Sequence, residues 1–181
     1  MASEDVIHQI HGLFESAILS VFAALGCPIR RILEPPRELK GVPLASMDAG
    51  SRDLEIMLFI GLPLTVLALS YPVKSEDIFA VDESHLEDWI LEIANQVMGR
   101  LKNALLRAGS DLQMALPSFY AEQRLSEVLP PGYDHAIFYF ELDGEVFECC
   151  LSISVIHPDL VLNLNAAGED GASHEGELEL F

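Results

Sequence analysis

The longest helical pattern in the chain runs from about Glu83 or Ser84 to Arg107, where apolar residues recur every three or four positions. Because each residue of an α-helix advances by roughly 100°, positions at this spacing fall on one face. Ala108-Gly109 is expected to end the helix. The face that we expect a core to bury consists of Leu86, Ile90, Ile93, Val97, Leu101, Ala104 and Ala108.

A second helix is predicted from Ser3 to about Leu25, with Gly26 and Pro28 ending it. Strands are predicted at His135–Leu142 and Glu145–Val155, because Asp143-Gly144 between them is a strong hairpin signal. The helix after Ser3 is predicted from apolar residues that recur every three or four positions, which are Val6, Ile10, Leu13, Phe14, Ala17, Ile18, Val21 and Phe22.

Between the two predicted helices, the pattern of hydrophobic and polar residues is less regular. It predicts a loop or edge strand from Glu34 past Gly41 and Pro43, and a short helix from Ser75 through Phe79. After the long helix, a strand interrupted at Pro117 is expected over 112–122. A further hairpin is predicted, its strands Asp53–Phe59 and Leu64–Leu69 joined at Gly61-Leu62-Pro63.

The order helix, hairpin, long helix, hairpin predicts an α+β fold in which two long helices pack on an antiparallel sheet. The two halves have a similar layout, so pseudo-two-fold symmetry is expected. The 181 residues are enough for one domain, which we place at 1–165. Residues 166–181 are acidic and poor in core-forming residues, so a flexible tail is predicted. Its apolar Leu178, Leu180 and Phe181 leave a docking peptide as an alternative.

Composition restricts the possible partners. The net charge is -19 with only 10 Lys and Arg residues, so neither nucleic acid nor an anionic membrane surface is an expected partner. No apolar run reaches the roughly 20 residues that a membrane span needs, and the first residues lack a secretory pattern. We therefore expect a cytoplasmic protein.

The 3 cysteines show no disulfide or zinc spacing and are expected to be buried thiols, and no metal site is predicted.

The polar side of the long helix carries unusual chemistry for a solvated face. Glu92 and Asn95 are three residues apart, so their side chains are neighbours, and Gly99 and Asn103 extend the same track. A carboxylate can hold a cation, a carboxamide can orient a water, and a glycine lets another backbone approach. This face is expected to be recognised by another molecule, although an exposed carboxylate and a structural amide remain the simpler interpretation.

Glu92-Ile93-Ala94-Asn95, followed by Gly99 and by Arg100-Leu101-Lys102-Asn103, resembles the central helix of the CheX proteins. These belong to the CheC/CheX/FliY family of chemotaxis phosphatases. The segment Leu112–Pro117 belongs to the same resemblance, which is close over this block and looser over the flanking hairpins, roughly residues 5–160. The resemblance implies a CheX/CheC-like fold.

The resemblance also implies an activity. Members of the family hydrolyse the aspartyl phosphate of CheY, a response regulator that itself holds the Mg²⁺, so this chain needs no cofactor of its own. Glu92 would pair with the active-site lysine of the regulator, and Asn95 would orient the attacking water. Because an acyl phosphate is already activated, placing a water in line is the main task, and a neutral amide does not repel the phosphoryl oxygens.

The chain departs from the CheC-type relatives in the number of such motifs, and this limits the prediction to one candidate site. CheC-type relatives carry two such motifs, but the first helix here has Glu15-Ser16-Ala17-Ile18, without an Asn at the fourth position. A single motif fits CheX, whose relatives form homodimers through sheet edges, and a homodimer is expected. The alternative function is a non-catalytic module that binds a receiver domain or another signalling protein.

Overall fold

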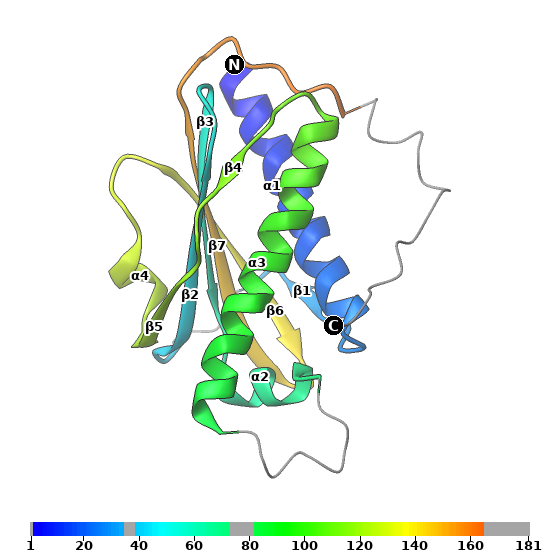
Figure 1. The fold of residues 1–181 in the computed structure, drawn as a ribbon, viewed down its shortest axis with the longest axis vertical. Helices are drawn as coiled ribbons and strands as arrows, with labels where there is room; N and C mark the ends of the chain where they lie inside the picture. The colour runs from blue at the N-terminus through cyan, green and yellow to red at the C-terminus, as the bar shows by residue number, and fades with distance from the viewer. Residues whose placement is uncertain (1, 35–38, 73–81, 165–181) are drawn as a thin grey trace.

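Two long helices cover one face of a seven-stranded antiparallel sheet (Figure 1). The computed structural model describes residues 2–34, 39–72 and 82–164. The helices are α1 (Ala2–Ala24), α2 (Leu64–Ser70), α3 (Glu83–Arg107) and α4 (Leu125–Val128). The strands are β1 (Arg30–Ile32), β2 (Val42–Gly50), β3 (Leu54–Gly61), β4 (Gln113–Met114), β5 (Ser118–Gln123), β6 (Asp134–Leu142) and β7 (Glu145–Val155).

The sheet has the pseudo-two-fold layout that the sequence predicts. Its strand order is β1-β6-β7-β3-β2-β4, and β5 also pairs with β2. Exchanging β1 with β5, β2 with β6 and β3 with β7 reproduces the same order in reverse, and the same exchange relates α1 to α3. The central pair, β3 and β7, runs in register from Leu54 opposite Val155 to Gly61 opposite Glu148. The α+β class with an antiparallel sheet is therefore confirmed.

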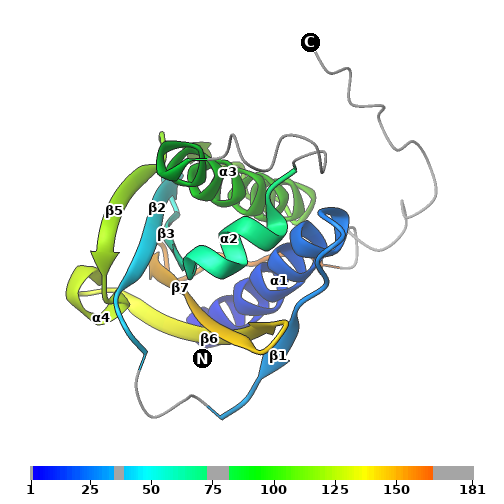
Figure 2. The ribbon, with the colours of Figure 1, turned by 90° about the horizontal axis from the view of Figure 1, so that it is seen from below.

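Helix α1 packs against α3 inside the curve of the sheet (Figure 2). The segment Glu4–Ala24 is long and apolar enough, by length and composition alone, to cross a membrane. Its apolar face is instead buried in the protein: Ile10, Phe14, Ile18 and Phe22 are fully enclosed. Phe14 meets Phe138 of β6 edge to face at 5.0 Å between ring centroids. This burial is the property of a core helix.

The opposite face of the sheet carries a smaller core. Leu44, Phe59 and Cys150 form it together with Leu125 of α4. Cys149, the neighbour of Cys150 on β7, belongs to the main core beneath the helices. The two cysteines therefore point to opposite faces, as expected of consecutive residues in a strand.

The predicted strand Leu64–Leu69 is wrong, because this segment is helix α2. Its buried residues are Val66, Leu67 and Ser70, which is helical spacing rather than alternation. Ser70 supports the helix by donating a hydrogen bond of 2.8 Å to the Val66 carbonyl and by accepting one of 3.1 Å from Trp89 Nε1. The short apolar run alone does not distinguish a buried strand from a buried helix.

The hairpin partner of β3 is β2, a segment that the sequence pattern predicts as a loop or edge strand. The pairing runs from Leu44 opposite Gly61 to Gly50 opposite Glu55. Strand β2 contains Pro, Ala, Ser, Asp and Gly, residues of low strand propensity, and it forms because it is paired on both sides. The other predicted strands and both long helices are confirmed within one or two residues at most ends.

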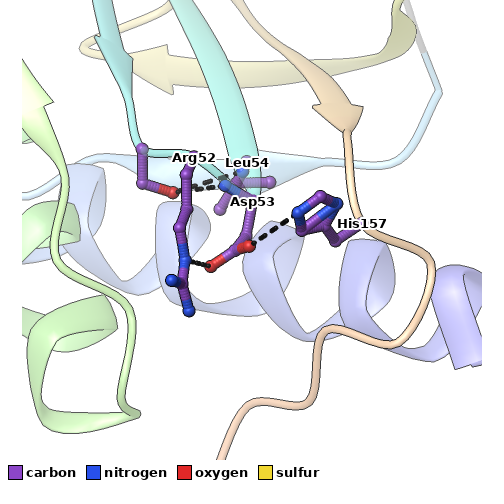
Figure 3. A network of polar contacts seen from close by, with 5 residues as sticks. Arg52, Asp53, Leu54 and His157 are labelled. Carbon is purple, nitrogen blue, oxygen red and sulfur yellow. Dashed lines mark hydrogen bonds and ion pairs between the residues drawn. The ribbon is translucent and has the colours of Figure 1, made fainter.

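A polar network joins the β2–β3 turn to the segment after β7 (Figure 3). Asp53 contacts Arg52 Nε at 3.2 Å and His157 Nε2 at 3.6 Å, and its carbonyl accepts a hydrogen bond from the Ile156 backbone. The chain then crosses the ends of both long helices, where Leu162 is buried and the Asn163 N–H donates to the Ala108 carbonyl at 3.0 Å. The described chain thus reaches Leu164 beside the last turn of α3. The predicted helix 75–79 and the tail 166–181 lie outside the described residues.

Candidate functional site

Helix α3 carries the candidate site and is firmly capped at its start. The Asp82 side chain accepts hydrogen bonds from Ser84 Oγ at 2.8 Å and from the His85 backbone N–H at 3.1 Å. These bonds lower the pKa of the Asp82 carboxyl to about 2, so it stays ionised where the helix dipole favours a negative charge. At the other end Gly109 has a φ of +96°, a conformation that glycine adopts without strain and that ends the helix.

The buried face of α3 fixes which residues point outward. Ile90, Ile93, Val97 and Leu101 are fully enclosed, as the periodicity predicts. Leu86 and Ala104, predicted on the same face, are only half-buried. The contact with α1 on one side and the sheet below widens the buried face, which also takes in Trp89, Ala94, Met98 and Leu105.

Glu92 and Asn95 are both exposed on the outer face of α3, on neighbouring turns. Glu92 Oε1 accepts a hydrogen bond of 2.9 Å from Gln96 Nε2. The Asn95 carboxamide makes no hydrogen bond to any residue in the described part of the chain. The carboxylate is therefore oriented by this protein, whereas the amide has donors and acceptor free for another molecule. The orienting role of Gln96 is not evident from the sequence.

Gly99 leaves the same face without a side chain, one turn after Asn95. Apart from the adjoining backbone of α3 itself, a Cβ atom added at Gly99 meets no atom of the described chain within 4 Å. Its lack of a side chain is therefore not required by packing within this molecule. It leaves the α3 backbone open to close approach from outside.

A groove runs beside this face, between the second half of α3 and the middle of α1. Its volume is about 490 Å³, and it is open to solvent. Arg100 spans it by donating a hydrogen bond of 2.7 Å to Ser20 Oγ on α1. Its main lining residues are Ser16, Ala17, Ser20, Arg100, Asn103 and Arg107.

The first helix has no equivalent of the α3 pair. In the tetrapeptide Glu15-Ser16-Ala17-Ile18, the fourth side chain is fully buried against the core and cannot reach a partner. Within residues 2–34, 39–72 and 82–164, no group of three or more His, Cys, Asp and Glu side chains is placed to hold a metal ion. The chemistry that α3 offers is recognition and orientation by a carboxylate and an amide.

Three solved structures resemble this fold over most of its length. Chemotaxis protein CheX from Vibrio vulnificus is 13% identical, with a TM-score of 0.66 over 81% of this chain and 99% of that chain. A CheC-like superfamily protein from Shewanella species PV-4 is 18% identical, with a TM-score of 0.63 over 80% and 97%. CheX in the CheX–CheY–BeF₃–Mg²⁺ complex from Borrelia burgdorferi is 15% identical, with a TM-score of 0.57 over 78% and 96%.

No protein-family model matches the chain, and no curated protein sequence matches it. At these identities the structural likeness establishes the fold alone.

Proposed function

We propose that this chain, which has the CheX/CheC fold, is a phosphatase that hydrolyses the aspartyl phosphate of a CheY-like receiver domain. The observation that carries the proposal is the Asn95 carboxamide, exposed and unbonded to the described residues, one turn from the oriented Glu92 carboxylate. A CheX protein of the same fold has been solved in complex with CheY, which supports this class of partner.

In the proposed reaction, a water attacks the phosphorus atom, and the bond between phosphorus and the receiver's aspartate oxygen breaks. The products are inorganic phosphate and a free aspartate carboxylate. Asn95 binds the water through its amide and holds it in line with the leaving oxygen, which is worth orders of magnitude in rate. The Mg²⁺ belongs to the receiver and neutralises the phosphoryl charge, so this chain contributes orientation rather than a metal.

Glu92 has a different role in this proposal. Its carboxylate pairs with the active-site lysine of the receiver and fixes the register in which the two proteins dock. The hydrogen bond from Gln96 orients the carboxylate before docking, which reduces the entropy lost on binding. A second carboxylate in the place of Asn95 would repel the phosphoryl oxygens, which explains why an amide suits this position.

We also propose that the protein acts in the cytoplasm and that it forms a homodimer through a sheet edge. Strand β1, from Arg30 to Ile32, pairs only with β6 among the described strands, so one of its sides is available to a second copy. Light scattering on the purified protein tests the dimer. A mass of one chain at micromolar concentration contradicts it.

The test of the function is phosphate release from a phosphorylated receiver domain, with the chain present at substoichiometric amounts. We expect Asn95→Ala to lower the rate by about 100-fold, because the water is no longer oriented. Gln113→Ala is the matched control, since it removes an exposed carboxamide from β4 and should leave the rate unchanged. Equal rates for wild type and Asn95→Ala overturn the catalytic assignment.

The same assay distinguishes the phosphatase from the alternative, a non-catalytic module that binds a receiver or another signalling protein. A phosphatase turns over and shortens the lifetime of the phosphorylated receiver at a small fraction of its concentration. A binding module can only sequester the receiver one to one. A protective effect that saturates at equal concentrations therefore supports the module and contradicts the enzyme.

A further inference from the structure

The groove between α1 and α3 is a basic surface on a strongly acidic protein. Arg100 and Arg107 line it, and they are two of the 10 basic residues of the chain. No acidic side chain lines the groove. Neither arginine has a carboxylate within 4 Å in the described part of the chain. The groove thus presents positive charge that the surrounding protein does not neutralise.

Helix polarity accounts for only part of this arrangement. Basic residues in the last turn are favoured by the negative end of the helix dipole, and that applies to Arg107. Arg100 lies two turns earlier and is held across the groove by Ser20. Its place in the groove, at the end opposite Arg107, is therefore not explained by the helix end.

The described chain ends close to this groove. After β7 the backbone crosses the start of α1 and the end of α3, as the orange segment of Figure 1 shows. Leu162 is buried there, and Asn163 is bonded to Ala108, the residue directly after Arg107. The described chain therefore ends, at Leu164, next to the end of α3 that carries Arg107.

These 17 residues have the opposite charge to the groove. They contain five carboxylates and neither Lys nor Arg, and the carboxylates are Glu169, Asp170, Glu175, Glu177 and Glu179. Arg100 and Arg107 are seven residues apart, about 10 Å along the helix axis. An extended chain of this length can span up to about 55 Å, so its carboxylates reach both arginines. Because the segment is tethered beside the groove, its effective concentration there is on the order of millimolar.

We propose that the acidic segment 165–181 of this chain binds in the groove between α1 and α3, with its carboxylates paired to Arg100 and Arg107. Asn103, which also lines the groove, lies one turn after Gly99 on α3, so an occupied groove obstructs a protein that docks on that part of the helix. This consequence, competition between the segment and a receiver, rests on the proposed function. The binding of the segment does not.

The test uses the full chain and a zero-length carbodiimide reagent, which joins an amine to a carboxylate with loss of water. Arg107→Lys keeps the positive charge and supplies an amine in the groove. We expect an amide bond within one chain, joining position 107 to a carboxylate of residues 169–179, located by mass spectrometry of the peptides. It should be lost in roughly 1 M salt, where charges more than about 3 Å apart are screened. It should also be lost when Arg100→Glu is added.

Arg124→Lys is the matched control, because it places the same amine at an exposed position beside α4, on the opposite face of the sheet. Equal coupling of the segment to positions 107 and 124 overturns the proposal, as does no coupling at 107. A link that joins two chains instead of one shows that the segment of a second copy fills the groove, which also overturns it.

A second measurement examines the competition. Replacing the five carboxylates by Gln should lower the KM for the phosphorylated receiver and leave kcat unchanged, because the competitor is removed and the catalytic face is intact. An unchanged KM, with the cross-link present, shows that the segment binds without obstructing the receiver. If neither protein has phosphatase activity, the proposed function fails while the cross-link still decides whether the groove is occupied.

Discussion

Gln96 Nε2 and Glu92 Oε1 are joined by a hydrogen bond of 2.9 Å on the outer face of α3. The two residues are four apart, the spacing at which side chains on a helix meet. Asn95 lies between them in sequence and has no partner in the described structure. The proposed catalytic face thus combines one side chain that the protein orients with one that is left for its partner.

We predict that Gln96→Ala weakens receiver binding without slowing the chemical step. The Glu92 carboxylate then has to be immobilised on docking, at a cost of about 0.5 kcal/mol, so KM should rise roughly twofold while kcat stays constant. Steady-state phosphate release with the phosphorylated receiver measures both constants, and Gln113→Ala serves again as the control. A fall in kcat with constant KM contradicts the positioning role.

Substitutions at Gly99 should affect the stability of α3 and the binding of the receiver independently. Because an added Cβ meets no atom of the described chain apart from the adjoining backbone of α3, Gly99→Ala should stabilise α3 by about 0.5–1 kcal/mol, the usual cost of glycine in a helix. Gly99→Leu should fold equally well but weaken receiver binding, since its side chain projects from the docking face. Thermal unfolding and receiver titration check the two effects. Receiver binding that is unchanged in Gly99→Leu excludes this turn from the interface.

The periodicity of α3 predicts much of the fold and the exposed position of the candidate pair, for a physical reason. Once Ile93 and Val97 are buried, the helix geometry leaves Glu92 and Asn95 no position except the outer face. The hairpin at Asp143-Gly144 is equally local, because both residues adopt positive φ, the conformation that a tight hairpin turn requires.

The features that sequence reasoning misses depend on tertiary contacts. Helix α2 is defined by Ser70, whose hydroxyl contacts Trp89 from a distant part of the chain. Strand β2 forms because it has partners on both sides, not because its residues favour strands. The bridge from Arg100 to Ser20 joins two helices 80 residues apart, and no local pattern encodes it.

The thiols of β7 should be unreactive in the folded protein. Burial raises the pKa of Cys149 well above its usual value and that of Cys150 to about 11. The thiolate is the reactive species, and at pH 8 only about one Cys150 in 1,000 is ionised. We expect iodoacetamide to label only Cys27, which is half-exposed, until denaturant is added. Peptide mass mapping measures this, and rapid native labelling at position 150 contradicts the burial.

Glu148 on β7 should make the folded protein less stable as pH rises, whereas a salt-bridged carboxylate makes it more stable. Partial burial raises its pKa, and this outweighs a hydrogen bond from the Leu125 backbone that acts in the opposite sense. A carboxyl whose folded pKa is raised contributes stability below its unfolded pKa. That contribution is lost as pH rises through the folded value.

We therefore predict that Glu148→Gln raises the Tm at pH 7, because the amide keeps an acceptor for the Leu125 N–H and removes a charge that is costly to bury. The gain should shrink to nothing below about pH 4, where the wild-type carboxyl is protonated in both states. Glu145→Gln, at an exposed position on the same strand, is the control and should show no gain at either pH. Thermal unfolding between pH 3.5 and about 8 tests the prediction. A gain that is equal at every pH would show that the effect comes from packing rather than from the titration of Glu148.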